Sequence, residues 1–118
     1  MFLTPRSGSG TARYAITSGG SGAEQRIDGP AALPSGTWTH IAVTHTANLG
    51  VLYVNGVEAA RNTALTVHPS ALGATTQNWI GRSQYAGDPS LAAAVDGFRV
   101  YSRALSASEI VQLHSTGQ

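Results

Sequence analysis

Apolar and polar residues alternate along most of the chain, and turn-forming residues interrupt the alternation at short intervals. This pattern is typical of an all-β protein. It predicts strands over residues 12–17, 24–27, 38–44, 51–54, 57–60, 78–81 and 94–101. Residues 38–44 are apolar on both alternating faces, which predicts a central strand covered on both sides.

The strongest local signal is Asn55-Gly56, which separates the strand-like runs 51–54 and 57–60. Asn-Gly is the preferred pair for a type I′ hairpin turn, because both central residues of that turn need positive φ. We therefore expect a tight β-hairpin here.

The end of the chain has a different period. Ser106 followed three residues later by Glu109 is a capping box, and Leu105, Ile110 and Leu113 form a short apolar stripe. A short helix over residues 107–113 should therefore pack on the strands. The predicted fold class is an antiparallel β-sandwich with one short C-terminal helix.

Composition narrows the classes of function. The 118 residues correspond to one domain, 42% of them apolar and only 11% charged, whereas charged residues make up about a quarter of an ordinary domain. A surface of uncharged polar residues is common in secreted β modules. The net charge of +1 and the absence of a basic stripe disfavour nucleic-acid binding. No apolar run approaches the roughly 20 residues of a membrane-spanning helix.

The absence of cysteine excludes disulfides and thiolate sites. The N-terminus lacks the features of a signal peptide. If the parent protein is secreted, as we expect, its export signal lies outside this chain.

Four motifs together carry a family resemblance. They are residues 36–44, 52–56, 79–83 and 95–106, the last followed by Glu109-Ile110. In this order they resemble the laminin-G-like domains of the concanavalin A-like superfamily, to which pentraxins are related. The resemblance implies a jelly-roll sandwich. Members of the family begin with additional strands, so we expect residues 1–118 to be a single module that lacks its N-terminal strands. An open sheet edge would result, and we expect self-association through it.

Catalytic groups are sparse. The chain has six carboxylates, Glu24, Asp28, Glu58, Asp88, Asp96 and Glu109. Glycosidases need two acids facing each other across a cleft, and those of this superfamily carry them in patterns such as E-x-D-x-x-E, which this sequence lacks. His40 and His45 fall on opposite faces of a regular strand and make poor joint metal ligands. We therefore expect no enzyme.

The candidate site is the loop over residues 82–88. Tyr85 lies in a polar, glycine-containing segment beside Arg82, Gln84 and Asp88, where an aromatic side chain is difficult to bury. An exposed aromatic among hydrogen-bonding groups is the pattern expected of a ligand-contacting loop. These four residues and Trp79 are the predicted carbohydrate-binding set, and an ordinary surface loop is an equal alternative. The aromatics Trp38, Tyr53, Phe98 and Tyr101 are expected in the core.

The resemblance also implies a calcium site, since related domains bind calcium with carboxylates in rim loops, one of which corresponds to residues 82–88. Here the loop carries one carboxylate, Asp88, whereas calcium takes six to eight oxygens. Asp88 with Gln84 would form only a weak site, and a turn role for Asp88 before Pro89 is favoured. Asp96 and Arg103 are expected to form a structural ion pair.

The resulting functional prediction is a non-catalytic carbohydrate-binding or accessory module of a secreted carbohydrate-active protein such as a glycoside hydrolase. The alternative is a structural or adhesion module that contacts other domains or proteins without binding sugar. Because a fold alone does not establish a function, the first prediction rests on analogy.

Overall fold

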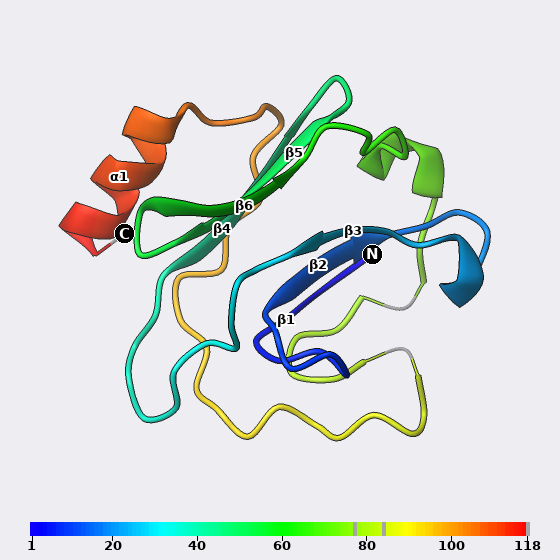
Figure 1. Ribbon diagram of the computed structural model, residues 1–118, viewed down its shortest axis with the longest axis horizontal. Helices are drawn as coiled ribbons and strands as arrows, with labels where there is room; N and C mark the ends of the chain where they lie inside the picture. The colour runs from blue at the N-terminus through cyan, green and yellow to red at the C-terminus, as the bar shows by residue number, and fades with distance from the viewer. Residues whose placement is uncertain (77, 84, 118) are drawn as a thin grey trace.

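The computed structural model describes residues 1–76, 78–83 and 85–117. Two antiparallel sheets of three strands each, followed by a C-terminal helix, make up its regular structure (Figure 1). The first sheet contains β1 (Phe2–Thr4), β2 (Arg13–Ile16) and β3 (Gln25–Asp28), and the second contains β4 (Ile41–Thr46), β5 (Leu49–Val54) and β6 (Val57–Asn62). Short 3-10 turns occupy Ser21–Ala23 and Pro69–Leu72, and helix α1 spans Ala107–Thr116. The expected β-rich class with one terminal helix is confirmed.

The second sheet is a meander of two tight hairpins. Strand β4 pairs with β5 from Ile41↔Val54 to Thr46↔Leu49, and β5 pairs with β6 across the Asn55-Gly56 turn. Asn55 and Gly56 have φ values of 50° and 79°. Positive φ at both positions is what a type I′ turn requires, so the predicted hairpin is confirmed.

The two sheets contribute side chains to one core cluster. Tyr14, Ile16 and Ile27 from the first sheet pack with Leu52 of β5 and with Leu65, which follows β6. A polar contact also joins the two sheets: Asn62 Nδ2, at the end of β6, donates a hydrogen bond of 2.8 Å to the carbonyl of Arg26 in β3.

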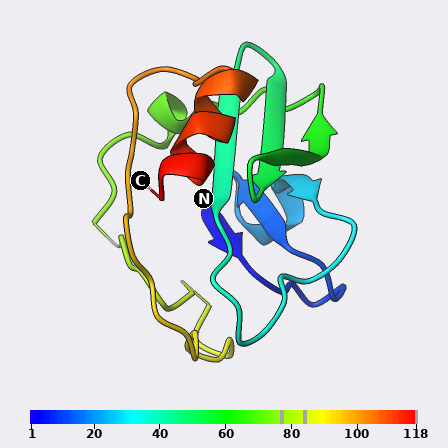
Figure 2. The same ribbon diagram turned by 90° about the vertical axis from the view of Figure 1, so that its left-hand side faces the viewer.

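Helix α1 packs on the opposite side of β5. Ile110 is buried against Val51 and Tyr53, which alternate with Leu52 along the strand. Figure 2 shows the helix lying across the second sheet. Strand β5 is therefore covered on both faces, and Tyr53 belongs to the core as predicted.

The ends of α1 follow the sequence signals. Ser106 Oγ accepts from the Glu109 backbone N–H, and the Glu109 carboxylate accepts from the Ser106 backbone N–H at 2.8 Å. Both halves of the predicted capping box are thus present. Gly117 adopts a left-handed conformation and caps the C-terminus, so the helix runs three residues beyond the predicted end.

Two predicted strands are wrong. Residues 94–101 form no strand, and residues 78–81 form an irregular loop. Instead, the described part of the segment from residue 78 to residue 103 runs along the outside of the molecule, and Phe98 and Val100 are 67% and 82% exposed. A strand needs a hydrogen-bonded neighbour, and the described residues offer none to this segment. Tyr101 is also exposed, so the core roles expected of Phe98 and Tyr101 are wrong.

Among the described residues, no helix is long and apolar enough to cross a membrane.

Candidate functional site

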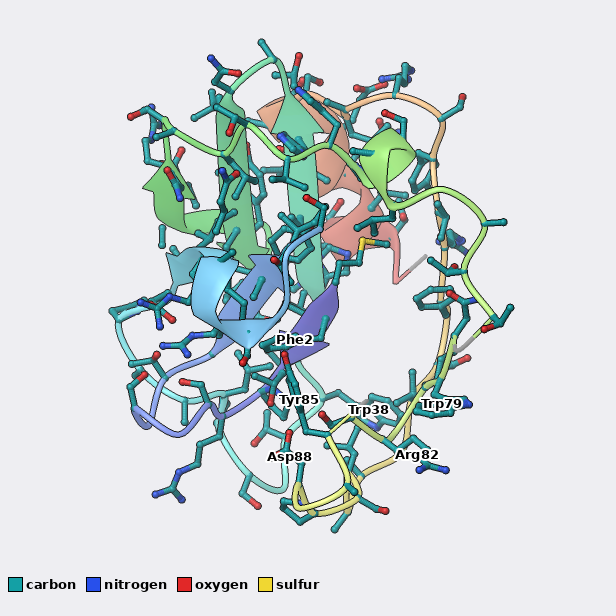
Figure 3. The ribbon with its side chains drawn as sticks, turned by 90° about the vertical axis from the view of Figure 1, so that its right-hand side faces the viewer. Phe2, Trp38, Trp79, Arg82, Tyr85 and Asp88 are labelled. Atoms are coloured by element: carbon teal, nitrogen blue, oxygen red, sulfur yellow. The ribbon has the colours of Figure 1, made fainter. Side chains whose placement is uncertain are left out.

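The candidate site lies on a loop closed by backbone hydrogen bonds. The Leu91 N–H donates to the Gly81 carbonyl at 2.7 Å and brings the two ends of the loop together. Within it, the Asp88 N–H donates to the Tyr85 carbonyl at 3.1 Å and closes a turn over residues 85–88, which agrees with the turn role predicted for Asp88. Figures 1 and 3 both place this loop at the lower side of the molecule, beyond the strands of the first sheet.

Tyr85 is held in place by two contacts with the first sheet and its flanks. Its hydroxyl donates a 3.0 Å hydrogen bond to Glu24 Oε1, just before β3. Its ring meets Phe2 of β1 edge-on, with 6.5 Å between centroids. The Glu24 carboxylate, which accepts this bond, raises the pKa of the Tyr85 hydroxyl, with smaller contributions from burial and Asp88. The side chain stays 43% exposed, so an oriented aromatic surface faces solvent, as the sequence predicted.

Trp79 and Arg82 form a second feature of the loop. The guanidinium carbon of Arg82 lies 4.0 Å from the centroid of the Trp79 ring, a cation–π arrangement. Trp79 is 43% exposed. The pair therefore combines an aromatic surface with a planar set of hydrogen-bond donors, and the two side chains hold each other in position (Figure 3).

The remaining residues of the predicted set contribute less. Gln84 lies outside the described residues. Asp88 is exposed, and no group of three or more His, Asp or Glu residues that could hold a metal ion occurs in the described ranges 1–76, 78–83 and 85–117. The residues described around Asp88 thus do not match the donor set that calcium prefers.

Trp38 was expected in the core, and this is wrong. The side chain is 72% exposed, because strand pairing starts only at Ile41↔Val54 and residues 38–40 extend past the end of β5. The Asn55-Gly56 turn marks where β5 ends, so the hairpin register was a signal that could have found this exposed tryptophan. Loop 29–40 lies at the lower side of the molecule in both views.

The hollow beside the candidate loop is small. A cavity of about 30 Å³ beside Met1, Phe2, Glu24 and Tyr85 has room for about one water molecule. A ligand at the loop would therefore bind on the surface.

A larger groove of about 390 Å³ lies elsewhere, between Tyr101, Leu105 and helix α1, and sequence reasoning missed it. Arg103 Nη2, at its edge, bonds Glu109 Oε1 at 2.6 Å, while Asp96 Oδ1 accepts from the Gly97 N–H. The predicted Asp96–Arg103 ion pair is therefore wrong: the helix cap brings Glu109 to Arg103 instead.

Comparisons with known proteins agree with this architecture. Residues 1–111 match a family model described as the concanavalin A-like lectin/glucanases superfamily. A crystal structure of residues 221–444 of an S-layer domain-containing protein from Clostridium thermocellum is similar, with 34% identity and a TM-score of 0.58. The match covers 88% of this chain and 51% of that one, so the chain spans about half the length of that structure. A comparison with curated proteins gave no match.

Proposed function

Because the chain belongs to the concanavalin A-like lectin/glucanase superfamily, we propose that it is a non-catalytic carbohydrate-binding module of a secreted or cell-surface carbohydrate-active protein. In this proposal the two sheets belong to a jelly-roll sandwich, and the loops at its lower side contact the glycan.

The observation that carries the proposal is a pair of exposed aromatic surfaces, Tyr85 on the loop closed by Gly81 and Leu91 and Trp79 just before that loop. Sugars present flat C–H faces that pack on aromatic rings, while their hydroxyls bond planar polar groups. Trp79 and Tyr85 offer such rings, and Arg82 and Asp88 lie on the same loop as Tyr85. The rings are oriented before any ligand binds, which lowers the entropic cost of binding.

The shape of the site favours an extended ligand. With only a small cavity beside Tyr85, the affinity must come from several shallow contacts along a chain of sugars. Trp38, exposed on a second loop at the same side of the molecule, provides a further surface for such a chain. We therefore propose a polysaccharide, rather than a single monosaccharide, as the ligand.

The proposed location rests on the similar structure. That protein is described as S-layer domain-containing, which supports placing the present module in an extracellular or cell-surface protein.

One observation favours the second candidate, a structural module. Val95, Phe98, Val100 and Tyr101 expose apolar surface along one continuous segment. Exposed apolar patches often mark contacts with other protein surfaces. In this case the segment would pack against a neighbouring domain, or against a second copy through an open sheet edge, and no sugar would bind.

Isothermal titration against a panel of plant and bacterial polysaccharides separates the two candidates. We expect saturable binding that Tyr85→Ala weakens at least tenfold, while the matched control Tyr101→Ala, which removes an exposed tyrosine at the groove, leaves it unchanged. A parallel series in EDTA tests for calcium: binding lost in EDTA would restore a role for Asp88. Absence of heat from a folded protein with every glycan would contradict the proposed function.

A further inference from the structure

All four histidines of the chain lie in two ring-to-ring contacts. His40 and His114 have ring centroids 5.7 Å apart, and His45 and His68 stack almost in parallel at 4.5 Å. In each pair one partner lies in or just before β4, and the other belongs to a later segment. The first pair connects the sheet to helix α1.

The His40–His114 contact is fixed from both sides. The His40 N–H donates to Asn55 Oδ1 at 2.9 Å, and its carbonyl accepts from the Asn55 N–H at 2.8 Å, so the hairpin turn holds its backbone. His114 lies against Gly56, where an added Cβ would stand 3.2 Å from His114 Cδ2. His40 Nδ1 is buried without a hydrogen-bond partner among the described residues.

The charged groups around the pair are already engaged. On β6, Glu58 Oε2 accepts from Arg61 Nη2 at 2.6 Å, and on α1 Glu109 is bonded to Arg103. Tyr53 is the titratable group of β5, and the turn residues carry no charge. None of the ion pairs in the described ranges involves a histidine. A proton added to His40 would therefore have no carboxylate partner among the residues that the structure describes.

We propose that the His40–His114 contact is a pH-sensitive clamp that holds the C-terminal end of helix α1 on the second sheet and opens on acidification. When both rings are neutral, they pack; when both are protonated, like charges face each other at 5.7 Å. His114 lies in the last turn of α1, where helix carbonyls attract a cation. In the described part of the chain, no comparable group stabilises a protonated His40.

The sign of the effect follows from burial. Burial and the neighbouring His114 lower the pKa of His40 below its ordinary value of 6.5. A histidine whose pKa is lowered in the closed state stabilises that state at pH values above its pKa in the unfolded chain. This stabilisation is lost as the pH falls through the pKa of the closed state. Opening would expose the cluster that Ile110 forms with Val51 and Tyr53.

The size of the effect can be bounded from the distance. Consider two unit charges 5.7 Å apart in a medium whose dielectric constant lies between that of bulk water and half that value. Their repulsion shifts the equilibrium between the closed and the open helix about three- to tenfold. Added salt should weaken the effect, since one of the rings is exposed.

Amide hydrogen exchange followed by NMR tests the clamp. Between pH 7.5 and pH 5.0, after correction for intrinsic exchange, protection of α1 amides should fall about three- to tenfold more than that of β5 amides. His40→Gln and His114→Gln should each remove this difference, whereas the control His68→Gln, in the other pair, should retain it. An unchanged pH dependence in both clamp variants would overturn the proposal.

A second measurement uses only the wild-type chain, in case a variant fails to fold. The α1 amide shifts should change with the same midpoint as the His40 ring signals. Independent midpoints, or α1 protection that does not depend on pH, would also overturn the proposal.

Discussion

Gly50 offers a sharp test of how the two sheets meet. It lies buried in β5, and a Cβ at this position would stand 2.7 Å from Ile27 Cδ1 and closer still to Leu65 Cδ2. Contacts under 3.0 Å essentially never occur at real Cβ atoms. Ile27 and Leu65 are 1% and 0% exposed, so neither side chain can move into solvent. Gly50→Ala must therefore force a rearrangement of the shared core.

The cost can be estimated from known overpacking effects. Inserting a methyl group into a packed core destabilises by about 1–3 kcal/mol. The lower entropy of alanine in the unfolded chain offsets about 0.4–1 kcal/mol of that. Because two contacts fall below 3.0 Å, the cost should lie in the upper part of that range, which leaves a net loss of about 1–2.5 kcal/mol, a large part of the stability of a domain this size. Urea unfolding followed by far-UV circular dichroism should show a lower midpoint with an unchanged m-value.

Two variants make the result specific. Gly8→Ala is the matched control, because nothing lies within 4 Å of its Cβ position, and it should change stability by less than about 0.5 kcal/mol. Leu65→Ala removes the side chain that Gly50→Ala would meet, so the double variant should be more stable than the sum of the two single effects. Equal stability of Gly50→Ala and Gly8→Ala would refute the packing of both sheets around Gly50.

The other predictions concern α1, the hairpin turn and the exposed segment. Ser106→Ala should lower the urea-unfolding free energy by about 1 kcal/mol through loss of the N-cap. Arg103, followed by Ser106, lowers the pKa of Glu109 to about 2, so its stabilisation should be complete above pH 4.5 and lost towards pH 2, as helical ellipticity can show. Gly56→Ala should cost at least about 1 kcal/mol, because Gly56 has φ of 79°; a smaller loss on urea unfolding would contradict the turn geometry. If the exposed segment mediates self-association, Phe98→Ser should lower the mass measured by light scattering.

Features determined by neighbouring residues could be predicted from the sequence. The Asn55-Gly56 hairpin depends on the φ preferences of two residues, and the capping box depends on the side chains of Ser106 and Glu109. Both are present in the structure. The exposure of Tyr85 could also be predicted, because its polar and glycine-rich surroundings offer no apolar environment.

Features that depend on distant partners could not be predicted. Residues 94–101 have the alternation of a strand, but a strand forms only where another strand accepts its backbone hydrogen bonds, and the described chain provides none. The family pattern indicated a strand at this position.

The candidate site also combines features that the sequence could predict with features that it could not. Sequence identified Arg82 and Tyr85 as parts of one exposed loop and placed Trp79 on a strand before it, but it could not foresee that Tyr85 bonds Glu24, which lies 61 residues earlier. It also assigned Trp38 to a strand, because aromatic residues are frequent in strands. The Asn55-Gly56 turn, which ends β5 at Val54, indicates that no partner strand reaches that position.

The most direct test of the proposed function is an NMR titration of the isotope-labelled chain with oligomers from a panel of plant and bacterial polysaccharides. If glycans bind at the candidate site, amide and indole signals from residues 79–91, together with the Trp38 indole, should shift in a saturable way while signals of α1 stay unchanged. Shifts confined to Tyr101 and the groove beside α1, or no shifts with any glycan, would contradict the proposed function.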